Sequence, residues 1–129
     1  MKKILLCDDE FIIRDYHETL IELELDSETE FVHAKDGNEA IELLAQKNDF
    51  DLIICDMNMP SVNGDKVHEY NQDHNKAPFI MLSGDGTQFA SEISDFSKDN
   101  KCEVVSKPWE GNELIDKILS FLEPDFEII

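Results

Sequence analysis

Short apolar runs alternate along the chain with longer segments in which apolar residues recur every three or four positions. The runs cover residues 4–7, 52–55, 79–82 and 104–106, and a fifth, more alternating run covers 30–34. Uninterrupted apolar runs of this length are typical of strands that are covered on both faces, as in a parallel sheet flanked by helices. The pattern therefore predicts five strands alternating with five helices in a doubly wound α/β sheet.

The segments between these runs have the periodicity of amphipathic helices. Their apolar positions, in chain order, are Ile13, Tyr16, Leu20 and Leu23; Ala40, Ile41 and Leu44; Val67 and Tyr70; Phe89, Ile93 and Phe96; and Ile115, Ile118, Leu119 and Leu122. We expect each set to pack against the sheet. The spacing of Asp36 and Glu39 predicts a capping box at the second helix, and the third should begin near residues 63–65.

The run at residues 30–34 is short and alternates between apolar and polar residues, which suits the edge of a sheet. An edge position for this second strand favours the flavodoxin-like order 2-1-3-4-5, with helices on both faces. In that order the winding reverses between the first and third strands, and ligands bind at the carboxyl ends of the strands near such a point. Residues that follow the strands are therefore the candidate site.

Four of the five runs end at a reactive side chain: Asp8 and Asp9, Asp56, Ser83 and Lys107. Gathered carboxylates repel one another unless a cation compensates, and oxygen-only ligands that leave room for water and phosphate favour Mg²⁺. Lys107 adds a point charge and Ser83 a hydrogen-bond donor for a phosphoryl group. Asp56 stands alone at its strand end, so we predict that it is the nucleophile. One such aspartate alone would more often be a turn or helix cap; the whole set predicts a phosphoryl-transfer site.

As a set these residues resemble the receiver domains of response regulators in two-component signalling. The resemblance runs from Lys2 to about Leu122 and rests on Asp8-Asp9-Glu10, Asp56-Met57-Asn58-Met59-Pro60, Gly64, Ser83-Gly84 and Lys107-Pro108. It implies that Asp56 accepts a phosphoryl group from a histidine kinase or a histidine phosphotransfer protein. It also implies that Mg²⁺ is held by Asp56, by Asp8 and Asp9, and by the backbone carbonyl of Asn58, and that Ser83 and Lys107 contact the phosphoryl group.

The sequence departs from the family pattern at Val104, where receivers usually carry an aromatic residue that turns inward on activation. Valine has little rotamer freedom to report such a change, so we expect output to use the loop at residues 83–86, which contains two glycines. We expect Gly84 to leave the pocket mouth open, and the resemblance implies that Asp85 and Asn58 occupy positions that face incoming water in the family. These positions predict a short-lived phosphoryl state, and Pro108 completes the implied pocket.

Composition narrows the class of protein. The length of 129 residues fits one domain, residues 1–122, with a short C-terminal tail at 123–129. Thirty acidic against 11 basic residues give a formal charge of −19, which argues against nucleic-acid and membrane partners. No run approaches the roughly 20 apolar residues of a membrane span.

The cysteines and histidines carry no further site in this interpretation. Cys7, Cys55 and Cys102 lack metal-ligand spacing and suggest no disulfide framework, which favours the cytoplasm. Cys7 and Cys55 precede the key carboxylates, but small buried core residues are the favoured interpretation over redox modulation. The four histidines, His17, His33, His68 and His74, share no spacing and are interpreted as surface or edge residues.

Two alternative functions stay open at this point. A phosphatase of the haloacid dehalogenase type also uses a strand-end aspartate and Mg²⁺, but it typically needs Asp-x-Asp, and here Asn58 follows Asp56. A binding module could keep the fold and use no phosphate, although the complete set of five residues argues against it. The leading interpretation is a single-domain response regulator that is not an enzyme beyond its own phosphoryl transfer and dephosphorylation. It would signal by contact with an unknown downstream protein.

Overall fold

Five parallel strands form one sheet in the order β2-β1-β3-β4-β5, which confirms the predicted order and fold class. The strands are β1 (Lys2–Cys7), β2 (Thr29–Ala34), β3 (Leu52–Asp56), β4 (Phe79–Ser83) and β5 (Cys102–Ser106). This computed structural model describes residues 2–25, 28–46, 49–60, 62–83, 102–106 and 113–122. The predicted helix with Phe89, Ile93 and Phe96 lies outside these ranges.

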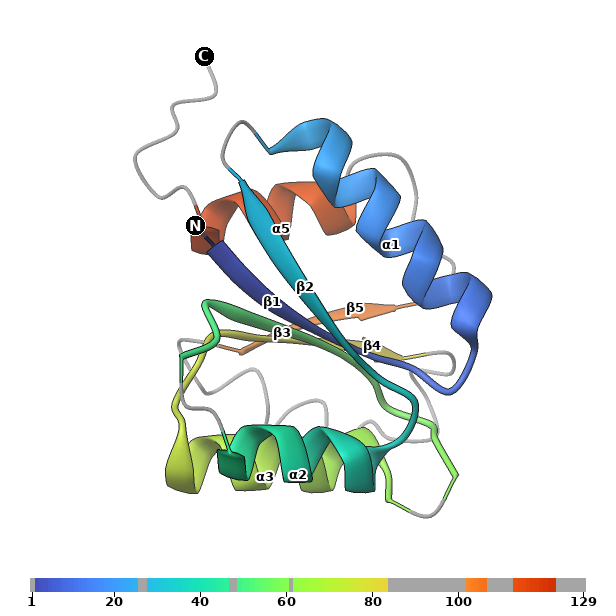
Figure 1. Cartoon of the computed structure of the whole chain (residues 1–129), viewed down its shortest axis with the longest axis vertical. Helices are drawn as coiled ribbons and strands as arrows, with labels where there is room; N and C mark the ends of the chain where they lie inside the picture. The colour runs from blue at the N-terminus through green and yellow to red at the C-terminus, as the bar shows by residue number, and fades with distance from the viewer. Residues whose placement is uncertain are drawn as a thin grey trace.

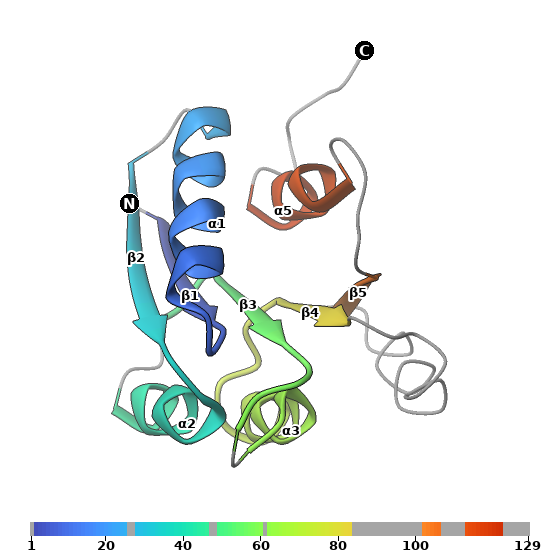
Figure 2. The same ribbon diagram turned by 90° about the vertical axis from the view of Figure 1, so that its right-hand side faces the viewer.

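The helices cover both faces of the sheet. They are α1 (Phe11–Glu24), α2 (Gly37–Gln46), α3 (Gly64–His74) and α5 (Glu113–Leu122). Figure 1 shows α1 and α5 on one face and α2 and α3 on the other, and the turned view in Figure 2 shows the same three layers. None of the helices in the described ranges combines the length and the apolar character that a membrane crossing requires.

The core is divided between the two faces because alternate side chains of a strand point in opposite directions. Leu5, Ile53 and Phe79 pack toward α2 and α3, whereas Leu6, Ile54 and Ile80 pack toward α1 and α5. Every residue of β3 is buried. Each such aliphatic side chain contributes about 1.5–3 kcal/mol when it is removed from water. Double-sided burial explains why the strands read as unbroken apolar runs.

The strand register places the polar residues at the carboxyl ends of the strands on one rim of the sheet. Cys7, the last residue of β1, pairs with Cys55 of β3, and Asp56 pairs with Leu82 of β4. Asp8 directly follows β1, so it lies at the same end of the sheet as Asp56. Strand β2 pairs with β1 alone among the described strands, which confirms its predicted edge position.

The buried face of α1 differs from the predicted one. Tyr16 and Leu23 are 54% and 77% exposed, whereas His17 and Ile21 are buried. The helix is apolar on two sides, so the spacing of its apolar residues does not by itself choose the side that meets the sheet. The structure also corrects the interpretation of two histidines: His17 and His68 are buried, and the His68 ring packs edge-on against Phe79 with centroids 5.1 Å apart.

The start of α2 confirms the predicted capping box with one difference. Asp36 Oδ1 accepts a hydrogen bond of 2.8 Å from the Glu39 N–H. The Glu39 carboxylate reaches back to the N–H of Lys35, at 3.2 Å, rather than to that of Asp36. The Asp36 side chain thus satisfies a backbone donor that the helix start leaves open, whereas the Glu39 side chain binds the chain just before the helix.

Candidate metal and phosphoryl-transfer site

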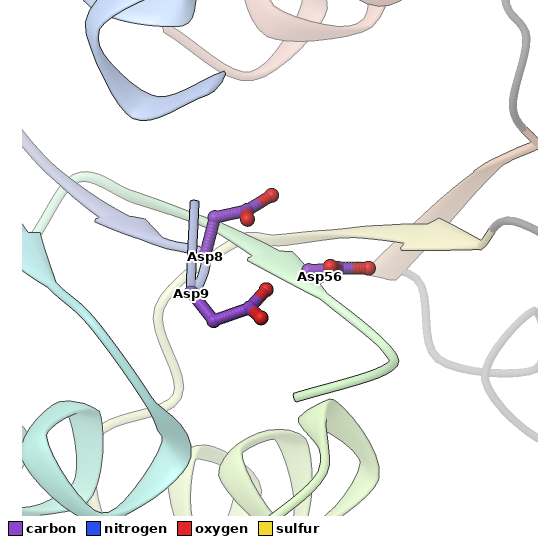
Figure 3. Close-up of side chains that lie close together, drawn as sticks. All are labelled: Asp8, Asp9 and Asp56. Carbon is purple, nitrogen blue, oxygen red and sulfur yellow. The ribbon is translucent and has the colours of Figure 1, made fainter. Parts of the chain in front are cut away.

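Three carboxylates meet at the carboxyl ends of β1 and β3. Carboxylate oxygens of Asp8, Asp9 and Asp56 all lie within 4.8 Å of one another, and Figure 3 shows the three side chains gathered there. Asp8 and Asp56 are 3% and 6% exposed, while Asp9 is exposed. Three of the predicted site residues are thus brought close enough for their carboxylate oxygens to share one hard cation.

Local backbone hydrogen bonds set the direction of the two buried carboxylates. Asp8 Oδ1 accepts from the Glu10 N–H at 2.8 Å, and Asp56 Oδ1 accepts from the Asn58 N–H at 3.3 Å. Each bond links a carboxylate to the amide two residues further on, which is the geometry of an Asx turn. The chain can therefore leave each strand in a tight turn while the acidic side chain stays at the rim.

The site has a strongly negative field. Two buried carboxylates within 4.8 Å repel each other by about 3–4 kcal/mol at an effective dielectric constant of about 20. Burial raises the pKa of the nearby Cys55 thiol well above its usual range, and the Cys7 thiol and then the Asp56 and Asp8 carboxylates raise it further. A divalent cation would offset this repulsion, and a donor set made only of oxygen fits Mg²⁺.

The remaining predicted site residues divide into described and undescribed positions. Asn58 is exposed beside Asp56, and the role of its carbonyl as a ligand stays a prediction. Ser83 ends β4 one position beyond the residue that pairs with Asp56, so its backbone lies at the same rim. Four further predictions, Gly84, Asp85, Lys107 and Pro108, lie outside the described residues. Val104 is half-buried in β5 and packs on the α2 and α3 side.

Arg14 is a residue of this region that the sequence pattern did not single out. Its Nη1 donates a hydrogen bond of 2.6 Å to the backbone carbonyl of Asp8. On sequence alone an arginine in an amphipathic helix reads as a solvated position. The one signal for Arg14 in the sequence was composition, because the chain has a single arginine and 30 acidic residues.

Comparison with known proteins identifies the class. The sequence model of the response regulator receiver domain family matches residues 4–119. The chain therefore belongs to this family, whose members are the aspartate-phosphorylated modules of two-component signalling and bind Mg²⁺ at a cluster of aspartates.

Individual relatives agree with this assignment. The transcriptional regulatory protein SrrA of Staphylococcus aureus is 29% identical over 121 residues, which are 93% of this chain and 47% of SrrA. The chain thus spans about half the length of the curated relatives it matches.

Two solved structures share the fold along nearly their whole length. The response regulator protein TrrA from Thermotoga maritima, in complex with Mg²⁺–BeF, is 31% identical with a TM-score of 0.76, covering 95% of this chain and 100% of TrrA. The Vibrio cholerae chemotaxis protein CheY4 is 26% identical with a TM-score of 0.74, covering 95% of this chain and 99% of CheY4.

Proposed function

We propose that this chain accepts a phosphoryl group on Asp56 in a Mg²⁺-dependent reaction and signals by protein–protein contact. The observation that carries the proposal is the acid cluster, with its carboxylate oxygens within 4.8 Å of one another. Asp56 is preferred as the acceptor because it ends β3, the middle strand of the sheet, whereas Asp8 and Asp9 share the turn after β1. The adjacent pair suits a metal site and leaves Asp56 for the covalent step.

The proposed Mg²⁺ ligands are Asp8, Asp9, Asp56 and the backbone carbonyl of Asn58. When bound, Mg²⁺ supplies positive charge to the phosphoryl oxygens and to the acceptor carboxylate. TrrA, which is 31% identical, was solved in complex with Mg²⁺–BeF, and this supports the assignment of the same kind of cofactor here.

The chain's own residues would perform the transfer as follows. A carboxylate oxygen of Asp56 attacks phosphorus, the P–N bond of a phosphohistidine breaks, and the histidine leaves as neutral imidazole after taking up a proton. The Asn58 N–H, which donates to Asp56 Oδ1 at 3.3 Å, fixes the carboxylate in one orientation. Ser83 and Lys107 are proposed to contact the transferred group, one as a hydrogen-bond donor and the other as a charge.

The proposed phosphoryl donor is a histidine kinase or a histidine phosphotransfer protein. Support comes from α1, which begins two residues after Asp9 and exposes large apolar side chains. Phe11 is 66%, Ile12 75%, Tyr16 54% and Leu23 77% exposed. Phe11, Ile12 and Tyr16 lie in the half of α1 next to the rim, whereas Leu23 lies in its last turn, and exposed apolar side chains beside a reactive rim are typical of a docking surface. A donor helix packed on this side of α1 would stand close to the acid cluster.

The domain assignment is part of the same proposal. Residues 1–122 are proposed to form one receiver domain, with residues 123–129 following it. The match to 100% of the solved TrrA chain supports this. A cytoplasmic location is proposed because the described cysteines are free thiols, as expected in a reducing compartment.

Acetyl phosphate and Mg²⁺ provide the test. The whole chain is incubated with both, and intact mass is followed with time for the native chain, for Asp56→Asn and for Asp73→Asn, an exposed aspartate on α3 that serves as the matched control. We expect one labile phosphoryl group on the native and Asp73→Asn chains, none on Asp56→Asn, and none when Mg²⁺ is chelated. Steady release of many phosphates per chain from a phosphomonoester supplied in place of acetyl phosphate would indicate a phosphatase instead, and no modification at all would indicate a binding module.

A further inference from the structure

Arg14 joins the turn that carries the acid pair to the edge strand. Its Nη1 donates to the carbonyl of Asp8 at 2.6 Å and, at 3.5 Å, to the carbonyl of Ala34. Its Nε donates to Nδ1 of His33 at 3.2 Å. The guanidinium group therefore spans three acceptors at the corner where β1 and β2 end.

The hydrogen-bond partners define one state of His33. Arginine has only donors, so Nδ1 of His33 is the acceptor, and the proton of the neutral ring sits on Nε2. Nε2 lies 2.9 Å from Glu18 Oε1 and donates to it. His33 pairs in register with Leu6, which packs toward α1, so the ring lies on the same face of the sheet as Arg14 and Glu18.

The Arg14 contact acts on the backbone that orients the metal-site carboxylates. The Asp8 carbonyl belongs to the peptide group that leads to Asp9, so its direction sets the relative placement of the two side chains. The Asp8 N–H is fixed as well, because it donates to the Ala34 carbonyl at 3.1 Å. Arg14 thus completes a frame that holds the Asp8 peptide groups on both sides.

The charge of Arg14 suits this position. It is the chain's one arginine, and basic residues number 11 against 30 acidic ones. A guanidinium stays protonated at all ordinary pH values and offers a rigid planar fork of donors. Because Arg14 binds a backbone carbonyl, it brings positive charge close to the cluster without occupying a carboxylate oxygen that a cation would need.

We propose that Arg14 is a positioning residue for the acid pair Asp8–Asp9, and that His33 and Glu18 hold its guanidinium in place. The inference rests on the proposed function, because it assumes that the acid pair binds Mg²⁺. It adds that the affinity for Mg²⁺ depends on a hydrogen-bonded chain from Glu18 through His33 and Arg14 to the Asp8 carbonyl.

Calorimetric titration of the whole chain with Mg²⁺, at constant pH and ionic strength, tests the inference. Residues that orient metal ligands typically change metal affinity by about 10–100-fold when they are replaced, so we expect Arg14→Ala to weaken Mg²⁺ binding about tenfold or more. Arg14→Lys should recover little of the lost Mg²⁺ affinity, since an ammonium group keeps the charge but cannot donate to His33 and to the Asp8 carbonyl at the same time. Lys117→Gln removes one positive charge at a pair with Glu103, 3.1 Å apart on α5 and β5, and should leave binding unchanged.

Two substitutions of His33 separate positioning from simple packing. In His33→Asn the amide oxygen can take the place of Nδ1 and keep the acceptor for Arg14. In His33→Gln the amide nitrogen can take the place of Nε2, which keeps Glu18 but loses that acceptor. We expect near-native Mg²⁺ affinity for the first variant and a loss like that of Arg14→Ala for the second. Because the His33 side chain is 31% exposed, both variants should fold even if Arg14→Ala does not.

The outcomes keep this inference distinct from the proposed function. If Arg14→Lys and His33→Gln bind Mg²⁺ as tightly as the native chain, or if both His33 variants lose affinity equally, the positioning role is wrong while the receiver function stands. If the native chain binds no Mg²⁺ and takes no phosphoryl group from acetyl phosphate, the proposed function itself fails.

Discussion

Gly64 begins α3 directly against the proposed phosphoryl acceptor, and its replacement by alanine should couple stability to function. A Cβ atom at this position would collide with the backbone oxygen of Asp56 and would lie 2.9 Å from Met81 Sδ. The Gly64 N–H donates to the Met57 carbonyl at 2.8 Å, so the helix start cannot withdraw without losing that bond. Gly64→Ala must therefore displace either the Asp56 peptide group or the first turn of α3.

Two opposing effects set the magnitude. Alanine is favoured over glycine by up to about 1 kcal/mol inside a helix, and by less at its first residue. Forcing an extra methyl group into a packed site costs about 1–3 kcal/mol. The collision dominates because a backbone oxygen cannot rotate away, so we expect a net loss of about 1–2 kcal/mol. For a chain of this size the loss corresponds to a melting temperature lower by about 3–8 °C.

Thermal unfolding and the rate of phosphoryl uptake from acetyl phosphate are the assays, with Gly37→Ala as the matched control. A Cβ at Gly37 would collide in the same way with the backbone oxygen of Val62, which is not a site residue. We expect both variants to lose stability, but only Gly64→Ala to slow uptake, by about tenfold or more, since small displacements of reacting groups have effects of that order. Equal uptake rates in the two variants, or a Gly64→Ala variant as stable as the native chain, would show that Gly64 does not hold Asp56 in place.

Three further predictions concern stability. Burial raises the pKa of Cys55, so above about pH 8.5 the unfolded chain loses a thiol proton that the folded chain keeps. The free energy of unfolding of the native chain should therefore fall by up to about 1.4 kcal/mol per pH unit. In urea titrations, Cys55→Ala should show a flatter pH dependence. The Asn71 side chain hydrogen-bonds both the carbonyl and the N–H of Ala77, at 2.8 and 3.1 Å, so Asn71→Ala should lower the free energy of unfolding by about 2–4 kcal/mol. A loss below roughly 0.5 kcal/mol in urea unfolding, the size of a surface substitution, would contradict this. Lys76 has a φ of 59°, so Lys76→Gly should raise stability by about 0.5–1 kcal/mol and Lys76→Val should lower it; the reverse order of melting temperatures would count against the left-handed conformation.

The strands could be predicted from the sequence because burial on both faces of the sheet requires an apolar residue at nearly every position of a strand. Every residue of β3 is buried, and an unbroken apolar run is the direct record of that environment. The edge position of β2 followed from its alternation. Cys7 and Cys55 are buried, as predicted from their place in the same runs. The acid cluster followed from strand order, since residues after β1 and β3 must meet at one rim once the order is known.

The features that the sequence pattern did not predict depend on which of several possible side chains packs into a limited space in the core. Apolar residues occupy two sides of α1, and the side with Ile21 and His17 packs against the sheet, whereas Tyr16 and Leu23 are exposed. The buried His68 fits against Phe79 through ring packing, which leaves no periodic signal. Arg14 contacts a backbone carbonyl, and such a contact does not depend on the identity of the residue it reaches.

Chemical mapping of the phosphorylated residue shows directly whether Asp56 is the phosphoryl acceptor. The whole chain is treated with acetyl phosphate and Mg²⁺ and then with sodium borohydride, which reduces an aspartyl phosphate to homoserine, and peptides are sequenced by mass spectrometry. We expect homoserine at position 56 alone, and none when Mg²⁺ is chelated. Homoserine at position 8 or 9 with residue 56 unmodified would contradict it.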